Sequence, residues 1–352
     1  MPNDQYKLGE LLGRGGMGQV HVARHRSGRI VAIKRVRNTL SSDRLVVSRL
    51  SDEARLLRTV SHPNVVRALD HGTSADGLPF LVMDLAYGAS LSELIARHGW
   101  LSLERTVAIA AQLFAGLAAI HDAQIVHADL KSQNILVDDI DIVTIIDFGL
   151  ARAVSSRPTR SGLVAGTPAY MAPETIAGAP PSVTGDIYAA GAILYEMLTG
   201  STPFAGHVST ILTRQLSEAV EPPSLRAPEL QIPAAVDDVV LRALDPSPIT
   251  RYQSVAELAA AFTAAIDGVI APVRAVSVDI WSERLTTQLS DLSDLSDRPT
   301  RRREAATERH EERPGLLISA ALARAQRLIE VHRIADAVEE LQATLPELRP
   351  TL

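Results

Sequence analysis

Cysteine is absent from the 352 residues, and lysine is scarce. The absence of cysteine excludes disulfide bonds, thiolate metal ligands and cysteine nucleophiles. Of the 35 basic residues only Lys7, Lys34 and Lys131 are lysine, and the rest are arginine. In a chain that prefers arginine so strongly, a retained lysine suggests a place that needs a compact ammonium group, not a planar guanidinium.

Excess positive charge and long hydrophobic runs are missing as well. The net charge is −6, which disfavours binding to nucleic acid or to an anionic membrane. The first residues, MPNDQYKLGELLG, contain no apolar signal core, and no stretch reaches roughly 18 uninterrupted apolar residues. We therefore expect a cytoplasmic protein with no membrane span and no nucleic-acid partner.

The first part of the chain has the pattern of a β-sheet with one helix. Strand-like runs cover residues 19–25 and 29–37, and apolar residues at helical spacing follow over 42–60. Two further strand-like runs cover 64–72 and 79–86. This pattern predicts a small, strand-rich lobe over residues 1–85.

Helical patterns dominate after a hinge expected near residues 84–89. They include 103–123 and several helices with proline-rich loops over 173–266, interrupted by the short strands NILVDD and VTIIDFG. The fold class predicted from this order is α+β, with a larger helical lobe over 86–268.

The last part of the chain changes in composition. Residues 269–313 are polar, with a short Leu-Ser-Asp repeat, and predict a mobile linker. Residues 314–352 regain a helical period and predict a helical hairpin, similar to one tetratricopeptide-type unit. A single hairpin cannot bury its own apolar face, so we expect it to dock on a protein partner, on a second copy or on the main domain.

A glycine-rich stretch, LGRGGMGQV, places Gly13, Gly15 and Gly18 before Val20. Glycine lets backbone N–H groups approach a polyphosphate closely. The stretch lies between two strands and does not open a helix, which argues against a dinucleotide-binding fold. An ordinary glycine-rich turn is the alternative.

Lys34 in VAIK lies within an apolar strand, where an ammonium group is costly unless it is paired. Its side chain either reaches solvent or contacts nucleotide phosphates and is held by an acid of the next helix. Glu53 is the acid best placed for this, because Asp52 falls on a different helical face.

Three more motifs follow in order: VHADLKSQN (126–134), IIDFG (145–149) and GTPAYMAPE (166–174). With the glycine-rich stretch and VAIK, they match the signature set of protein kinases. Residues 6 to about 266 resemble the catalytic domain of Ser/Thr protein kinases, particularly the eukaryotic-like ones of bacteria. The resemblance implies transfer of the γ-phosphoryl group of ATP, with Mg²⁺ or Mn²⁺, to hydroxyls of protein substrates.

The resemblance also implies a role for each motif residue. Asp129 accepts the hydroxyl proton, Lys131 contacts the γ-phosphate, and Asn134 and Asp147 hold the metal. Lys34, paired with Glu53, holds the α- and β-phosphates. The nucleotide is expected to contact Leu12, Gly13, Gly15, Gly18, Val20, Ala32, Lys34, Met83, Asp84, Ala86 and Leu136.

In this arrangement the adenine lies between Val20 and Ala32 on one side and Leu136 on the other. Backbone groups of Asp84 and Ala86 bond its edge, and Met83 closes the rear of the pocket.

Further residues of the resemblance support the substrate side. Lys131 in D-L-K-x-x-N indicates Ser/Thr substrates, and Thr167 contributes to the substrate platform. Glu174 is expected to pair with Arg251. Asp186 is expected to brace the catalytic loop, although Tyr188 stands where the family commonly has tryptophan.

Ala128 departs from the family, which usually has arginine before the catalytic aspartate. That guanidinium pairs with a phosphate on the activation loop and orders it. Because alanine cannot, we expect an activity that does not strictly depend on loop phosphorylation.

Two similar stretches, SRPTRS (156–161) and DRPTRRR (297–303), each place a threonine between Arg-Pro and Arg. Thr159 and Thr300 are therefore candidate self-phosphorylation sites, or the second stretch mimics a substrate. Chance recurrence in arginine-rich loops is the alternative.

The competing function is a pseudokinase scaffold that binds nucleotide and presents the helical tail to a partner. The complete set of motif residues argues against it, and GTPAYMAPE argues against a small-molecule phosphotransferase. The sequence does not specify the physiological substrate, the activating signal, the oligomeric state or the partner of the tail.

Overall fold

The computed structural model describes residues 5–14, 18–36, 44–74, 77–147, 152–153 and 167–267. The linker and helical hairpin expected over 269–352 lie outside these residues. So do Gly15, Thr159 and Thr300.

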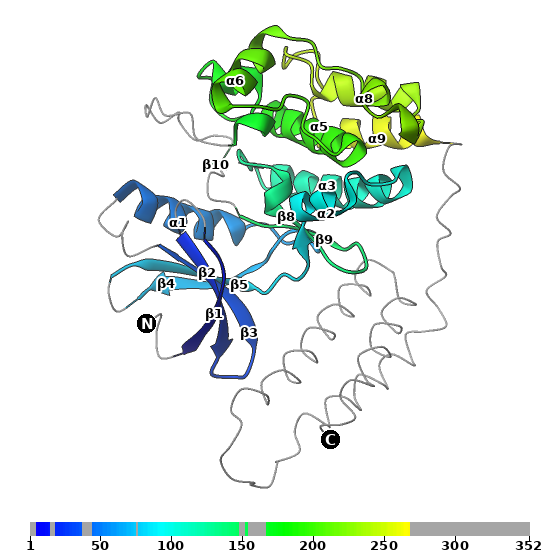
Figure 1. The fold of residues 1–352 in the computed structure, drawn as a ribbon. Helices are drawn as coiled ribbons and strands as arrows, with labels where there is room; N and C mark the ends of the chain where they lie inside the picture. Colours follow the sequence, from blue (N-terminus) through cyan, green and yellow to red (C-terminus); the bar gives the residue numbers. More distant parts are fainter. Residues whose placement is uncertain are drawn as a thin grey trace, which may run out of the picture. The chain divides into compact units, whose positions relative to one another are not determined.

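The smaller lobe is an antiparallel sheet with one helix against it (Figure 1). The strand order is β1-β2-β3-β5-β4. The elements of this lobe are β1 (Tyr6–Arg14), β2 (Gly18–His25), β3 (Ile30–Val36), α1 (Arg44–Leu57), β4 (Ala68–Thr73) and β5 (Pro79–Asp84).

The register of the sheet separates its side chains into two layers. Ala32 lies opposite Met83, and Lys34 lies opposite Val20 and Leu81. Because side chains alternate along a strand, these residues share one face. The apolar ones on this face pack into the main core, together with Leu50, Ala54 and Leu57 of α1. The other face carries a separate small cluster of Tyr6, Ala23, Val31, Ile33, Phe80 and Val82.

The predicted strand over 64–72 is shorter than expected, because it begins only at Ala68. The preceding residues pair instead with the larger lobe. Asn64 O accepts a hydrogen bond from Ile145 N at 2.8 Å, and Val66 N donates to Ile145 O at 3.0 Å. This segment therefore joins the two lobes, which the strand-like pattern of its sequence did not indicate.

The larger lobe is helical, with two short sheets at its base (Figure 1). The sheets are β10-β7 and β6-β8-β9, with β6 (Ala89–Ser90), β7 (Ile125–Val126), β8 (Ile135–Val137), β9 (Val143–Ile145) and β10 (Arg152–Ala153). The α-helices are α2 (Leu91–His98), α3 (Leu103–Asp122), α4 (Pro173–Ile176), α5 (Val183–Thr199), α6 (Val208–Ser217), α7 (Pro223–Arg226), α8 (Ala234–Ala243) and α9 (Val255–Ile266). The 3₁₀ turns are η2 (Ser132–Asn134), η3 (Pro168–Tyr170) and η4 (Pro228–Leu230).

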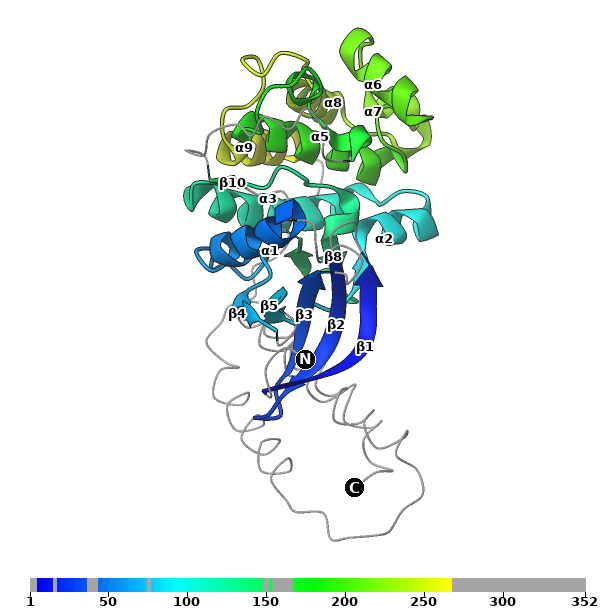
Figure 2. The same cartoon turned by 90° about the vertical axis from the view of Figure 1, so that its left-hand side faces the viewer.

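Helices α3 and α5 form the centre of this lobe, and Figure 2 shows α3 between the smaller lobe and α5. Residues 187–195 of α5 are all buried, so its sequence is apolar on every side. Within the described residues, α3 alone is long and apolar enough to cross a membrane by length and composition. The core helix of a globular domain passes the same test, and eight residues of α3 are buried in this core.

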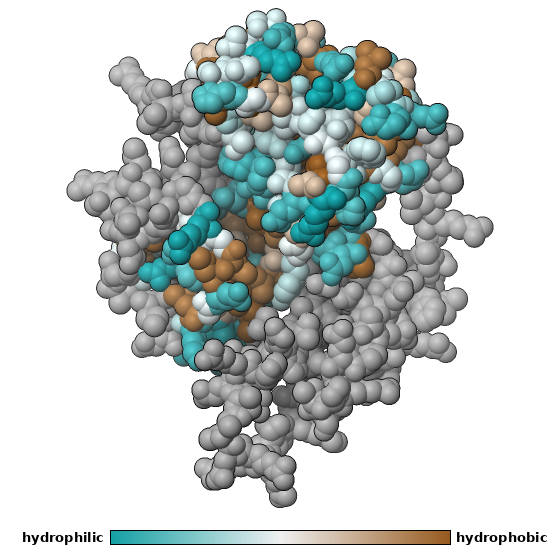
Figure 3. Space-filling view, viewed as in Figure 1, coloured by the Kyte–Doolittle hydropathy of each residue, from teal (hydrophilic) through white to brown (hydrophobic). Residues whose placement is uncertain are grey.

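The connection between the lobes depends on Gly88. Its φ is 113°, and a Cβ there would lie 2.3 Å from Val137 O. Only glycine tolerates both the left-handed backbone and this approach to β8. The bilobal α+β fold predicted from the sequence is confirmed. Figure 3 shows hydrophilic residues interspersed with hydrophobic ones over the visible face of the larger lobe, and hydrophobic residues gathered over the sheet of the smaller one.

Candidate active site

A buried lysine connects the two lobes at the candidate site. Lys34 Nζ donates to both carboxylate oxygens of Glu53, at 2.7 and 2.8 Å, and to Asp147 Oδ1 at 2.6 Å. The three residues come from β3, α1 and the segment after β9. Asp52, the neighbouring acid, points elsewhere and lies 3.6 Å from the exposed Arg55.

The charge of Lys34 is held by its partners. Burial alone would lower its pKa, but the carboxylates of Glu53 and Asp147 outweigh that effect and raise it above the ordinary value. The side chain of Glu53 is only 3% exposed, whereas that of Asp147 is 42% exposed. Lys34 is thus a fixed ammonium group, and its second partner faces an accessible space.

The β8–β9 hairpin places Asn134 and Asp147 at one end of the site. Ile135 lies opposite Ile145, and Ile146 N donates to Asn134 O at 2.8 Å. Asn134 directly precedes β8, and Asp147 follows shortly after the end of β9, so both residues lie at the same end of the hairpin. An antiparallel pair of strands thus brings these two distant motifs together.

The catalytic loop between β7 and η2 is fixed by Asp186 of α5. Asp186 accepts hydrogen bonds from His127 N at 2.8 Å and Ala128 N at 2.9 Å, and its Oδ2 lies 2.9 Å from His121 Nε2. Asp186 is 2% exposed, so these contacts are shielded from water. His127 is fully buried, and burial lowers its pKa, which keeps the imidazole neutral.

Ala128 has a left-handed backbone with φ 65°, and Asp147 has φ 64°. For a residue with a Cβ this conformation costs roughly 1–2 kcal/mol. The two hydrogen bonds to Asp186 hold the Ala128 peptide in it. The following residue, Asp129, contacts Lys131 through its carboxylate.

Asp129, Lys131 and Asn134 form a compact group. Lys131 Nζ donates to Asp129 Oδ2 at 2.6 Å, and Asn134 Nδ2 donates to Asp129 O at 2.9 Å. The side chains of Asp129 and Lys131 remain 16% and 20% exposed. A carboxylate, an ammonium group and an amide are thus presented together at the opening of the site.

The residues expected around the adenine lie on the inner face of the sheet and across from it. Ala32 and Met83 are buried as a cross-strand pair, and Val20 and Leu136 are partly exposed. Asp84 N donates to Arg67 O at 3.0 Å, so the N–H of Asp84 is already engaged. Its carboxylate binds Arg29 at 2.7 Å and Arg67 at 3.1 Å.

The two described glycines of the glycine-rich stretch differ in their surroundings. A Cβ on Gly18 would lie 2.6 Å from Arg35 O, so the packing of β2 against β3 requires glycine there. A Cβ on Gly13 would meet no atom of the described residues within 4 Å. Leu12 beside it is 51% exposed. Strand packing therefore gives no reason for glycine at 13.

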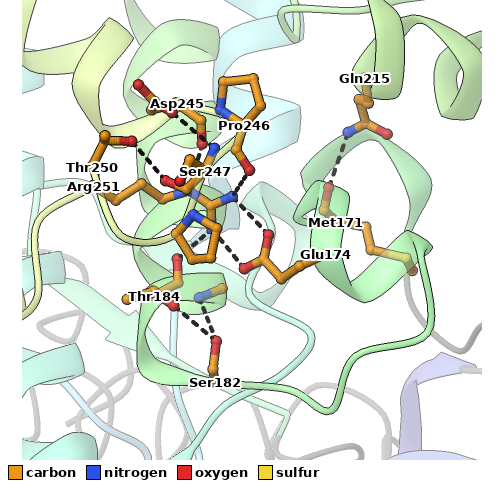
Figure 4. A network of polar contacts seen from close by, with 12 residues as sticks. Met171, Glu174, Ser182, Thr184, Gln215, Asp245, Pro246, Ser247, Thr250 and Arg251 are labelled. Atoms are coloured by element: carbon orange, nitrogen blue, oxygen red, sulfur yellow. Dashed lines mark hydrogen bonds and ion pairs between the residues drawn. The ribbon is translucent and has the colours of Figure 1, made fainter.

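Glu174 and the buried Arg251 form a second ion pair (Figure 4). Arg251 Nη1 and Nη2 each donate to one Glu174 oxygen at 2.7 Å. The guanidinium also lies over the ring of Tyr188, 5.0 Å from its centre. Tyr188, at the position where the family commonly has tryptophan, thus provides an aromatic face for this arginine.

The segment over 167–171 is anchored from both sides. Thr167 is partly exposed at the start of η3, and Tyr170 N donates to Thr167 O at 3.1 Å. Gln215 of α6 donates to Pro168 O at 2.9 Å and to Met171 O at 3.2 Å. Figure 4 shows the contact to Met171.

Sequence reasoning missed several residues that support this site: His121, Ser132, Tyr170, Glu196 and Gln215. Their partners are 26 to 65 positions away in the sequence. The available signal was an acid, Glu196, within the apolar stretch of α5, because a carboxylate in such a helix requires a partner.

The oxygen atoms of the site suit a hard divalent cation. Asp147 offers an accessible carboxylate, and Asn134 offers its amide oxygen, since the amide nitrogen is engaged by Asp129 O. Mg²⁺ prefers such oxygen ligands, and it usually completes its shell with water and substrate phosphates.

Comparison with known proteins agrees with this geometry. The protein kinase domain family matches residues 6–261. The chain is 37% identical over 261 residues to Serine/threonine-protein kinase pkn3 of Myxococcus xanthus, which covers 71% of this chain and 48% of pkn3. It is 38% identical over 263 residues to Serine/threonine-protein kinase PknE of Mycobacterium tuberculosis, which covers 74% of this chain and 46% of PknE. It is 37% identical over 265 residues to Serine/threonine-protein kinase PknB of Mycobacterium leprae, with 73% and 42% covered. The chain thus spans about half the length of these curated relatives.

Proposed function

Because the chain belongs to the protein kinase domain family, we propose that it is an ATP- and Mg²⁺-dependent protein kinase that phosphorylates serine and threonine hydroxyls. The observation that carries the proposal is the ion pair of Lys34 with Glu53, together with its contact to Asp147. These contacts hold β3, α1 and the segment after β9 in one arrangement, although the residues are up to 113 positions apart.

Each charged group then has a task in phosphoryl transfer, which depends chiefly on positioning and on stabilising charge. Lys34 holds the α- and β-phosphates. Asp129 orients the substrate hydroxyl and accepts its proton, and Lys131 contacts the γ-phosphate. Asn134 and Asp147 hold Mg²⁺, which neutralises charge on the phosphates when it is bound.

The adenine is proposed to lie between the Val20–Ala32 face and Leu136. Because Asp84 N is engaged by Arg67 O, we propose that the carbonyl of Asp84, with Ala86 beside it, contacts the adenine edge. Leu12 and Gly13, in the glycine-rich stretch, are proposed to cover the phosphates of the nucleotide. Among the described residues, no atom lies within 4 Å of the position of a Cβ on Gly13, which supports this role.

The lysines provide a matched experiment. The full chain is incubated with [γ-³²P]ATP, Mg²⁺ and a serine- and threonine-containing protein, and the modified residues are mapped by mass spectrometry. We expect phosphoserine or phosphothreonine that disappears with EDTA. Lys34→Met loses the transfer, whereas Lys7→Met, at an exposed position of β1, retains it. Equal loss in both variants, or transfer by Lys34→Met at the wild-type rate, contradicts the proposal.

We also propose that phosphorylation of the activation loop is not a strict requirement, because alanine at 128 cannot pair with a phosphate. Ser155, Ser156, Thr159 and Ser161 are replaced together by alanine. Substantial activity is expected to remain. Loss of activity with an unchanged melting temperature contradicts this part of the proposal.

The roles of residues 269–352 are proposals of the same kind. We propose that 269–313 links the kinase domain to a partner-binding hairpin, 314–352, and that Thr159 and Thr300 are self-phosphorylated. Mass spectrometry after incubation with Mg²⁺-ATP tests the self-phosphorylation, and two unmodified threonines contradict it.

If the linker mimics substrate, truncation after 268 lowers the KM for a peptide. Unchanged peptide kinetics contradict mimicry.

A further inference from the structure

Three buried polar side chains from three elements meet beneath the candidate site. Ser132 Oγ of η2 and Tyr170 Oη of η3 are 2.9 Å apart. Both donate to Glu196 of α5: Ser132 to Oε1 at 3.2 Å and Tyr170 to Oε2 at 2.8 Å. The exposed fractions are 0% for Ser132, 5% for Tyr170 and 9% for Glu196. The three contacts close a ring that is shielded from water.

The location of this ring connects the two halves of a substrate site. Ser132 directly follows Lys131 in the catalytic loop. Tyr170 ends the turn that begins after Thr167, on the substrate platform. Glu196 lies on the same helix as Asp186, which holds the other end of the catalytic loop through His127 N. Helix α5 therefore fixes the loop both before and after Asp129.

We propose that Ser132 is a positioning residue that fixes the substrate platform relative to Asp129, through its hydrogen-bonded ring with Tyr170 and Glu196. The inference rests on the proposed kinase function and adds to it the connection that aligns a peptide hydroxyl with the transferring groups. Ser132 contacts no reacting atom itself. It acts by holding the catalytic loop at a fixed distance from the substrate platform.

The two hydroxyls of the ring supply two hydrogens for three contacts. With both donated to Glu196, each carboxylate oxygen accepts one hydrogen bond, and either hydroxyl can instead donate across the Ser132–Tyr170 pair. Burial raises the pKa of Glu196 above its ordinary value, against the opposing effect of the hydrogen bonds from Tyr170 and Ser132. A glutamine at 196 offers an acceptor and a donor at the same place, so it preserves the ring.

Removing the Ser132 hydroxyl leaves the 2.8 Å bond between Tyr170 and Glu196 intact and separates the catalytic loop from it. Small errors in alignment reduce transfer strongly, since phosphoryl transfer depends on orientation. We expect Ser132→Ala to lower kcat/KM for a peptide about tenfold, with a higher peptide KM. The Kd for nucleotide stays within about twofold, because Lys34 and the sheet are untouched.

The experiment measures kcat, peptide KM, nucleotide Kd and melting temperature for the full chain and its variants. Tyr170→Phe is expected to behave like Ser132→Ala, and the double variant to be no more than about threefold worse than either, because both break one ring. Glu196→Gln keeps kcat/KM within about twofold of wild type, as a conservative replacement.

A matched control separates positioning from a loss of stability. Ser254 caps α9 by accepting from Glu257 N at 3.2 Å, far along the chain from the catalytic loop. Ser254→Ala also removes one hydroxyl and lowers the melting temperature, but it leaves peptide kinetics unchanged. The inference is overturned if Ser132→Ala and Tyr170→Phe keep the wild-type kcat/KM. It is also overturned if Glu196→Gln is as impaired as these two. If wild type itself transfers no phosphate, the proposed function fails instead.

Discussion

The pair of Glu174 and Arg251 allows a prediction of stability that can be worked out from contacts. The side chain of Arg251 is 0% exposed, and all five of its N–H groups have acceptors. Two go to the Glu174 carboxylate, and the others go to the carbonyls of Asp245, Thr184 and Pro246 at 2.6 to 3.1 Å. The guanidinium thus has no contact with water and depends on one carboxylate for its countercharge.

Removing that carboxylate leaves a buried cation that only dipoles stabilise. Breaking one side of a buried ion pair costs about 3–5 kcal/mol. The Glu174 side chain is 17% exposed, so we take the lower end, about 3 kcal/mol, for Glu174→Ala. For a domain of this size each kcal/mol corresponds to about 2–4 °C in melting temperature, which gives a decrease of roughly 6–12 °C.

The assay is thermal unfolding of the full chain at pH 7, with Glu174→Gln and Arg251→Ala beside Glu174→Ala. Glutamine keeps one acceptor and loses the charge, so its decrease is expected to be about half as large. The double alanine variant is expected to cost less than the sum of the single ones by at least about 1 kcal/mol. A Glu174→Ala melting temperature within about 2 °C of wild type refutes the reasoning.

Three further predictions concern the glycine-rich stretch, the catalytic loop and Lys34. Gly18→Ala is expected to lower the free energy of unfolding by about 1–3 kcal/mol, because its Cβ meets Arg35 O. Gly13→Ala is expected to keep the free energy of unfolding within about 0.5 kcal/mol of wild type and to raise the KM for ATP. Equal melting temperatures of the two variants contradict this. Ala128→Gly relieves the left-handed backbone and stabilises the fold by up to about 1 kcal/mol, so a lower melting temperature counts against it. The raised pKa of Lys34 means that its stabilisation is fully present below its unfolded value of 10.5 and is lost only as the pH rises through the still higher folded value. The difference in melting temperature between wild type and Lys34→Met should therefore be the same at pH 6 and pH 9, and a difference that shrinks towards pH 9 is inconsistent with it.

The fold could be predicted because its signals are local and periodic. The expected helix over 103–123 is Leu103–Asp122, and the strands expected over 19–25 and 29–37 are Gly18–His25 and Ile30–Val36. The apolar alternation of β3 also places Ala32 and Lys34 on one face. The error at 64–72 arose because Asn64 and Val66 pair with β9, far along the chain, and such pairing overrides a strand-like pattern.

The site could be predicted only as far as its motifs extend. Spacing and order brought out Lys34, Asp129 and Asp147. They could not show that β2 packing requires Gly18, or that Arg67 occupies the Asp84 N–H. The ring of Ser132, Tyr170 and Glu196 was also not predictable as a whole. Glu196 within an apolar helix indicates that a partner exists, but the contacts that identify Ser132 and Tyr170 form only after α5 has packed against the catalytic loop.

The central claim is that Asp129 directs transfer of a phosphoryl group to a protein hydroxyl. It is tested most directly by measuring ³²P transfer from Mg²⁺-ATP to a serine- or threonine-containing peptide, with nucleotide binding measured in parallel, for wild type, Asp129→Asn and the exposed control Asp122→Asn. The account predicts that wild type and Asp122→Asn transfer phosphate, and that Asp129→Asn binds nucleotide but transfers at least about 100-fold more slowly. Nucleotide binding by wild type without any transfer, as in a pseudokinase scaffold, or an equal rate in Asp129→Asn, would contradict it.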